Sequence, residues 1–400
     1  MKKRVTAGIV AAVMALTMWS CAAKEEEPMV IEPSVLHIYT DNGEFQTIAD
    51  AVCEKHPEWK GRIVVEVIEG DYCSVMTEKV DKALNPPEPV KKKDGEPEVI
   101  EEPVYYPDLI VSDIESIDGF INADYVVSLE EMGISAADTQ GMYPYTLKRT
   151  ENAEAKPTGL SWFVKPGAFV YRRSVAAENL GSDDPKDVQS YMRDWSTFCD
   201  TARTLSKKSG GRVKMLAGID DINRVFAGNT CFRGSEEDNA AGADVIAEME
   251  KNGFTAGTEY GTDRYYRKAL MGDVFGYFAD SDFIFDELTA NCGGTSKGMG
   301  SYGDWGVCEG PMPFITGGSW IFGTKECTDR EFAAAFMKAV CCERIAWNTH
   351  EDGRTVFVND IKTMTNAYNA GKGKADILGG MDYIEVYSNV AEEISGEQGQ

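Results

Sequence analysis

The stretch VLHIYTDNGEFQTIADAV, residues 35–52, decides the fold class. Its first five residues favour a β-strand, and the following Asp41, Asn42 and Gly43 are typical of a turn. Behind the turn, apolar residues recur with the i, i+3, i+4, i+7 spacing of one helix face. The residues with that spacing are Phe45, Ile48, Ala49 and Val52. The stretch therefore predicts a strand, a turn and a helix.

The same order recurs further along the chain. A strand predicted over 63–68 precedes a helical stretch with Met76, Val80 and Leu84 on one face, and a third strand over 109–111 runs into residues 112–115. Alternating strands and helices are typical of a parallel sheet in an α/β protein. Residues 85–103 are rich in proline and charge, which predicts a flexible, solvated loop.

Helix signals continue in the second half of the sequence. Pro185 suits the first position of a helix, and an apolar helix face runs from Trp195 to Leu205. Thr328 and Glu331 have the spacing of a capping box, which places a helix start at Thr328.

Length and composition limit the function classes. A chain of 400 residues favours about two domains, and a 43% hydrophobic share is enough for a large core. The net charge of −26 repels a phosphate backbone, so we expect no nucleic-acid partner. With three histidines in the chain, a histidine-built zinc site or a Ser/His relay is disfavoured, and we expect no metal, no cofactor and no catalytic residue.

The N-terminus is typical of an export signal. Basic residues 2–4 precede an apolar run over 5–19, which is too short to span a membrane, so residues 1–20 are predicted as a signal peptide. The run ends before Cys21 in a pattern that resembles a bacterial lipobox, with Cys21 as the acylated residue. Residues 21–34 would then be a lipid-anchored tether. The alternative is an ordinary secreted protein in which Cys21 stands by chance.

Nine further cysteines follow Cys21. The odd number leaves at least one thiol free, and the spacing contains no CxxC pair. Most of these cysteines are predicted as small buried apolar residues, and one or two disulfides stay open as an alternative.

Six segments together resemble a known family, the sugar-binding, family 1 type of extracellular solute-binding lipoproteins of ABC importers. They are HIYTDNGEF (37–45), YYPDLIVSDIESIDGFINADY (105–125), GLSWFVKPGAFVYRRSVAAENLGSDDPKDVQ (159–189), MLAGIDDINRVFAGN (215–229), VFGYFADSDF (274–283) and GDWGVCEGPMPFITGGSWIF (303–322). They cover most of the chain behind the signal peptide.

The resemblance implies an α/β fold of the two-lobed, periplasmic-binding-protein type II kind, closing on its ligand through hinge crossings between the lobes. We expect lobe 1 over 35–160, mainly lobe 2 over 161–310, and a return to lobe 1 with C-terminal helices over 311–400. The crossings are placed near 158–164 and 307–318. Relatives usually continue past the segment matching residues 378–395, so either this lobe closes differently or the sequence is a fragment.

Polar residues at strand ends are the first ligand candidates. Asp41, Asn42 and Glu44 follow the first predicted strand, and Asp113 and Glu115 follow the third. Carboxyl ends of parallel strands face the ligand crevice in open α/β sheets, and sugar hydroxyls need carboxylate and amide partners. Plain turn chemistry is the alternative for Asp41 and Asn42, and helix-dipole stabilisation for Glu44.

Aromatic rings supply the second kind of sugar contact. Trp162 lies in the first expected crossing, and Trp305 and Trp320 flank Gly317 and Gly318. The resemblance favours the tryptophans as stacking platforms, above all Trp162 and Trp320, and burial in the core is the alternative. The glycine pair would let backbone approach a ligand closely, or would form an ordinary turn.

Asp221 and Arg224 are the last candidates, as a ligand clamp or as a structural ion pair. Where sugar-binding relatives often carry aromatic residues, this chain has Asp41, Thr316 and the run 280–282 (DSD). These differences remove stacking surface and add acid, so a polar or cationic solute stays open beside a sugar.

Three function classes remain for a lipid-anchored protein outside the cytoplasm. The resemblance favours capture of a small solute, most of all a sugar or oligosaccharide, for an importer permease in the membrane to which Cys21 anchors the protein. The alternatives are a lipid-anchored glycoside hydrolase, whose paired carboxylates no sequence can exclude, and an adhesin-type lipoprotein.

Overall fold

The strand and helix predicted over residues 35–52 are both present, as strand β1 (Leu36–Thr40) and helix α2 (Phe45–Lys55). Phe45, Ala49 and Val52 form the buried face of α2, as their spacing predicts. This computed structural model describes residues 34–85, 105–233, 236–343 and 354–396. The predictions for the signal peptide, for Cys21 and for nearly all of the tether 21–34 and the loop 85–103 lie outside those residues.

A mixed sheet forms the centre of the fold, with strand order β2-β1-β3-β8-β4-β6-β5 and with β7 paired to β4. The pairs β1–β2, β1–β3 and β5–β6 are parallel, whereas β8 and β4 run antiparallel to their neighbours. Besides β1, the strands are β2 (Ile63–Val67), β3 (Leu109–Asp113), β4 (Gly159–Arg172), β5 (Lys214–Leu216), β6 (Val274–Ala279), β7 (Trp305–Cys308) and β8 (Phe314–Gly323). A separate small ribbon pairs β9 (Lys374–Ala375) with β10 (Met381–Asp382).

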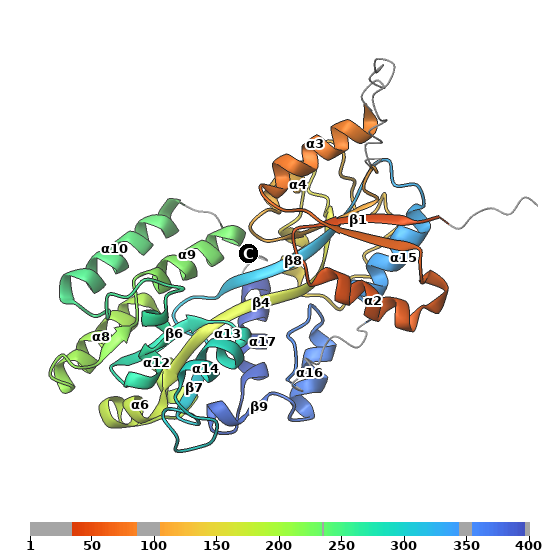
Figure 1. Cartoon of the computed structure of the whole chain (residues 1–400). Helices are drawn as coiled ribbons and strands as arrows, with labels where there is room; N and C mark the ends of the chain where they lie inside the picture. The colour runs from red at the N-terminus through yellow and green to blue at the C-terminus, as the bar shows by residue number, and fades with distance from the viewer. Residues whose placement is uncertain (1–33, 86–104, 234–235, 344–353, 397–400) are drawn as a thin grey trace, which may run out of the picture. The chain divides into compact units, whose positions relative to one another are not determined.

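The long strand β4 joins two sides of this sheet, which we call the β1 side (β1, β2 and β3) and the β6 side (β5, β6 and β7). Residues 159–167 of β4 pair with β8, and residues 168–172 pair with β6 and β7. Strand β8 lies beside β4 and pairs with β3 on its other edge (Figure 1). The β4–β8 register shifts twice, between Ser161 and Phe163 and between Lys165 and Pro166. Such irregularities bend strands locally.

Helices flank the sheet on both sides (Figure 1). Besides α2, those before β4 are α3 (Tyr72–Leu84), α4 (Asp118–Ile121) and α5 (Pro144–Lys148), with a 3₁₀ turn over Pro57–Trp59. Between β4 and β6 lie α6 (Arg173–Leu180), α7 (Pro185–Ser190), α8 (Trp195–Lys208), α9 (Asp220–Arg233), α10 (Glu236–Asn252), α11 (Asp263–Tyr266) and α12 (Lys268–Met271). The rest are α13 (Ser281–Phe283), a π turn over Ile284–Leu288, α14 (Thr289–Asn291), α15 (Arg330–Cys341), α16 (Ile361–Asn369), a 3₁₀ turn over Asp376–Leu378 and α17 (Tyr383–Gly396).

Two of the predicted helix details need correction. Helix α15 is capped by Asp329, whose side chain accepts a hydrogen bond from the Phe332 amide at 3.0 Å, and not by Thr328. Thr328 is instead held by buried Asp108, which accepts from its amide at 2.8 Å and from its hydroxyl at 3.1 Å. Leu84, expected on the buried face of α3, is 53% exposed at the last residue of that helix.

The predictions for α7 and α8 agree with the structure. Pro185 opens α7 behind an Asp184 cap, and α8 buries Phe198, Ala202 and Leu205 among its inward residues. The eight cysteines whose side chains are described form no disulfide with one another. None of the described helices is both long and apolar enough to span a bilayer.

Candidate ligand-binding site

The carboxyl ends of β1 and β3 bring three of the predicted residues together. The Asn42 side-chain amide donates to the Asp113 carboxylate, at 3.3 Å from Oδ2. The Asp113 backbone amide in turn donates to Asp41 Oδ1 at 3.4 Å. Parallel strands end at the same edge of a sheet, which explains why residues so far apart in sequence meet here. The result is an edge with two carboxylates and one amide.

Asn42 also stabilises the turn behind β1, which was the alternative role predicted for it. Its backbone amide donates to Thr40 Oγ1 at 2.9 Å, and its side-chain oxygen accepts from the Glu44 amide at the same distance. Glu44 precedes α2 without a side-chain cap bond and is exposed, as is Glu115 beyond β3. Both glutamates therefore lie at the surface near this edge.

The Asp113 carboxylate disfavours the charged form of Asp41. Burial, the larger effect, and the neighbouring Asp113 charge together raise the pKa of Asp41 to about 6. A carboxylate with a raised pKa gains more than an ordinary one from a donor that stabilises its charged form. The edge thus favours a partner rich in hydrogen-bond donors.

A second polar group lies where β4 and β8 change register. Lys165 of β4 forms an ion pair with Asp282 of α13, with 2.9 Å between Nζ and Oδ2. The Thr316 hydroxyl of β8 is hydrogen-bonded to Asp280 and lies 3.3 Å from the Lys165 carbonyl oxygen. Burial, the largest single effect, lowers the pKa of Lys165, but the charges of Asp282, Asp280 and Glu44 together raise it. Lys165 is thus attracted by carboxylates on the β6 side, from Asp280 and Asp282, and by Glu44 on the β1 side.

Lys165 was not a candidate from the sequence. Its signal was nevertheless present, because it is the single charged residue in the mostly apolar run from Gly159 to Tyr171. Asp280 and Thr316, two of the polar residues noted in the sequence in place of aromatic ones, are hydrogen-bonded to each other.

Asp221 and Arg224 at the start of α9 form no direct ion pair, although the Arg224 charge favours the ionised form of Asp221. Asp221 is fully buried and accepts a hydrogen bond from the Tyr265 hydroxyl, while its Oδ2 has no hydrogen-bond partner among the described residues. Burial raises the pKa of Asp221 to about 7. The Arg224 guanidinium lies 4.0 Å from the centre of the Tyr260 ring and donates to the Phe278 carbonyl at 3.4 Å. The Arg224 side chain therefore lies near the carboxyl end of β6.

The three tryptophans are buried in the core of this structure, which was the alternative to a stacking role. Trp305 and Trp320 are 0% exposed, with indole N–H groups donating to Ser301 Oγ at 3.1 Å and to the Thr146 carbonyl at 3.0 Å. Trp162 is 6% exposed, stands edge-on to Phe45 and has no partner for its Nε1 among the described residues. None of the three presents an open face for stacking.

The glycine pair makes room for neighbouring side chains. A Cβ on Gly317 would lie 3.2 Å from the Lys165 side chain, and one on Gly318 would lie 3.0 Å from the Trp320 ring. The Gly318 carbonyl accepts from the Ile114 amide at 3.0 Å, which ties β8 to the segment behind β3. Both glycines thus serve close packing at the same junction.

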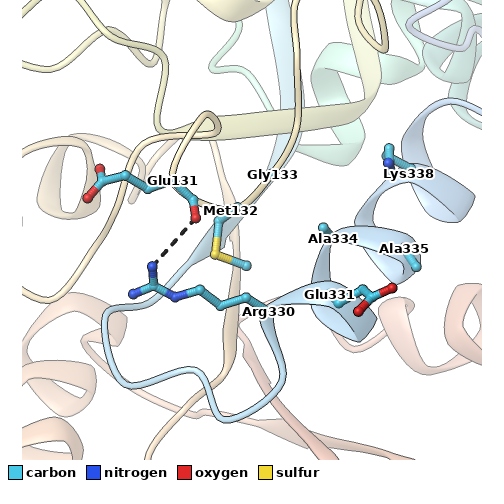
Figure 2. A pocket seen from close by; sticks show the side chains of 8 residues that line it. All are labelled: Glu131, Met132, Gly133, Arg330, Glu331, Ala334, Ala335 and Lys338. Atoms are coloured by element: carbon cyan, nitrogen blue, oxygen red, sulfur yellow. Dashed lines mark hydrogen bonds between the residues drawn. The ribbon is translucent and has the colours of Figure 1, made fainter.

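Two surface hollows lie away from these residues. One has a volume of about 470 Å³. Figure 2 shows its lining, where Glu131, Met132 and Gly133 face residues of α15. Its polar wall includes the Arg330 guanidinium, 3.5 Å from the Glu131 carbonyl oxygen. The second, of about 290 Å³, is lined by Thr295, Ser296, Lys297, Tyr302, Asp376, Gly379 and Gly380. No residue of the predicted site lines either hollow, and the described residues contain no cluster of three metal-ligating side chains.

Solved structures resemble this arrangement over nearly the whole chain. An extracellular solute-binding protein of family 1 aligns with a TM-score of 0.64 at 13% identity, covering 90% of this chain and 88% of its own. The sugar-binding protein MalE of Xanthomonas citri aligns at 0.58 and 14% identity, covering 90% and 85%. The fold is that of the extracellular solute-binding proteins. No protein-family model and no curated protein matches the chain.

A further structure with this solute-binding fold was solved with a sugar in place. The ABC transporter associated binding protein of B. animalis subsp. lactis, in complex with β-1,6-galactobiose, aligns with a TM-score of 0.54 at 12% identity and covers 90% of this chain and 86% of its own. The predicted two-lobed α/β class is thereby confirmed. The lobe boundaries and the ligand contacts stay predictions.

Proposed function

We propose that this protein is a lipid-anchored solute-binding protein that captures a carbohydrate outside the cytoplasm and delivers it to an ABC importer permease. The observation that carries the proposal is the polar edge formed by Asp41, Asn42 and Asp113, in a fold shared with proteins named for sugar binding. Ligands of α/β sheets bind at the carboxyl ends of strands, where this edge lies.

The chemistry of the edge suits a sugar. Hydroxyl groups both donate and accept, so they can satisfy the Asp41 and Asp113 carboxylates and the Asn42 amide together. Lys165, paired with Asp282 behind β6, and Arg224, bonded to the Phe278 carbonyl near the end of β6, would supply donors from the β6 side. A solute held by both sets would favour a closed arrangement of the two sides over an open one.

The first test removes one acceptor from the edge. Asp113→Ala should weaken binding of the captured solute by roughly tenfold to a hundredfold, because hydrogen bonds to a charged group contribute about 1.5–3 kcal/mol. Isothermal titration of the mature protein with a panel of neutral mono- and oligosaccharides measures the change. Asp244→Ala, an exposed aspartate on α10, is the matched control. Equal affinities of the two variants would contradict the proposed site.

Asp113→Asn distinguishes a sugar from a cationic solute. A cationic solute is considered because Asp41 and Asp113 place two carboxylates side by side. A neutral sugar keeps hydrogen bonds to the amide, whereas a cation loses its charge-assisted partner. Titrating the same variant with polyamines and amino sugars makes that comparison. Release of reducing ends from the oligosaccharides would instead favour the hydrolase alternative.

Membrane anchoring is tested independently of the ligand. We expect Cys21→Ser to move the exported protein from the membrane fraction to the soluble fraction, because the acyl chains are the predicted attachment. Fractionation and immunoblotting of cells that express the full chain measure this. A variant that stays in the membrane fraction would contradict the lipobox interpretation and leave solute capture intact.

A further inference from the structure

Tyr260 is an exposed aromatic residue that the sequence patterns did not single out. It lies between α10 and α11 and keeps 38% of its surface exposed. The Arg224 guanidinium lies over its ring, and the Tyr265 ring stands edge-on at 5.3 Å and 71°. A cation over a tyrosine ring is attracted by the ring quadrupole, so these contacts hold the ring in one orientation.

Hydrogen bonds hold the backbone around Tyr260 in place. The Tyr260 amide donates to Asp220 Oδ2 at 3.1 Å, and the Thr258 hydroxyl donates to the Ala217 carbonyl at 2.7 Å. Gly257 and Gly261 have positive φ angles of 63° and 79°, which a residue with a side chain rarely adopts. The chain therefore turns sharply before and after Tyr260, and the exposed ring is held by a well-bonded segment.

This ring lies on the β6 side, across the junction of β4 and β8 from the edge formed by Asp41, Asn42 and Asp113. Arg224, which lies over the ring, is bonded to the Phe278 carbonyl near the carboxyl end of β6. Tyr266 packs 6.5 Å from Tyr260 and 6.2 Å from Phe283, the last residue of the short helix that carries Asp282. Asp282 is the ion-pair partner of Lys165. A continuous series of contacts thus connects Tyr260 with the junction of β4 and β8.

We propose that Tyr260 is the residue on the β6 side that stacks against a sugar ring of the solute, with Arg224 as the residue that positions it. This inference rests on the proposed function. A sugar ring has an apolar C–H face that gains from an aromatic partner, and the three tryptophans are buried. Among the other exposed tyrosines, Tyr105 stacks on His37 and Tyr368 lies on α16.

The test compares variants of Tyr260 with a control of equal exposure. Tyr191, at the end of α7, is also 38% exposed, and its hydroxyl is bonded to the Leu180 carbonyl. Isothermal titrations of the mature protein use maltose, maltotriose, β-1,6-galactobiose and lacto-N-biose as probes. Tyr260→Ala should weaken the binding of those saccharides that the wild type binds by roughly tenfold to a hundredfold, the scale for losing one buried aromatic contact. Tyr260→Phe and Tyr191→Ala should both bind like the wild type.

The possible outcomes separate the inference from the proposed function. Wild-type affinity in Tyr260→Ala would overturn the stacking role alone, and so would an equal loss in Tyr260→Phe, since that variant keeps the ring. If the wild type binds none of the four saccharides and none of the larger sugar panel, the proposed function fails and the inference fails with it. Melting curves control for folding, and Tyr260→Leu, which keeps apolar volume but has no ring, replaces the alanine variant if that one melts early. Its affinity should fall as well.

Discussion

Replacing Trp320 with alanine is expected to lower the free energy of unfolding by about 3–5 kcal/mol, the usual cost of the cavity left by a buried aromatic residue. The ring is fully buried on β8, between Ser112 of β3 and Ser161 of β4. Its indole N–H donates to the Thr146 carbonyl, so the substitution also removes a partner from a buried acceptor. Urea denaturation at an unchanged m-value measures the loss.

The same variant decides between the two roles weighed for this residue. A stacking platform would lose ligand affinity and keep its stability, whereas a core residue loses stability while the folded fraction binds normally. Trp59→Ala is a useful comparison, because that ring is 9% exposed and stacks on His56 at 3.9 Å. If Trp320→Ala unfolds like the wild type and binds sugar weakly, the core assignment is wrong.

The sequence predicted this fold best where the signal is local. The turn at Asp41 and the face of α2 depend on residues within one short stretch, and both formed as expected. Thr328 shows how such a signal fails. The local spacing fits a capping box, yet Asp108, distant in sequence, takes the Thr328 amide and hydroxyl.

The candidate site could be predicted only in part for the same reason. Asp41, Asn42 and Asp113 were found because strand ends meet at one edge of a parallel sheet. Lys165 could not be predicted because its place in the site depends on the pairing of β4 with β8. Tyr260 could not be predicted because it lies in a loop, where the sequence has no periodicity. A tryptophan on a strand looks the same in sequence whether it is buried or lines a site, so burial of Trp320 becomes visible only when β3 and β4 are placed around it.

Asp221→Asn should change how stability depends on pH. Burial raises the pKa of Asp221 from its ordinary value of 3.8 to about 7, so the folded protein holds a proton that the unfolded chain releases above pH 4. The favourable effect of that proton is fully present below pH 4 and is lost as the pH rises to 7. Between pH 5 and pH 8 the wild type should therefore lose about 2–3 kcal/mol that the asparagine variant keeps, at about 1.4 kcal/mol per pKa unit. Urea denaturation of both proteins across this range measures the difference.

Asp41→Asn is the control that assigns the effect to a residue. Asp41 also has a raised pKa, of about 6, so its contribution has the same sign but is complete one unit earlier. The two residues lie on opposite sides of the sheet, and the effects of distant substitutions usually add. Between pH 6 and 7, stability should thus still fall in Asp41→Asn and level off in Asp221→Asn. If both variants follow the wild-type curve through that interval, Asp221 is already ionised in the folded protein, and its hydrogen bond with Tyr265 compensates for its burial.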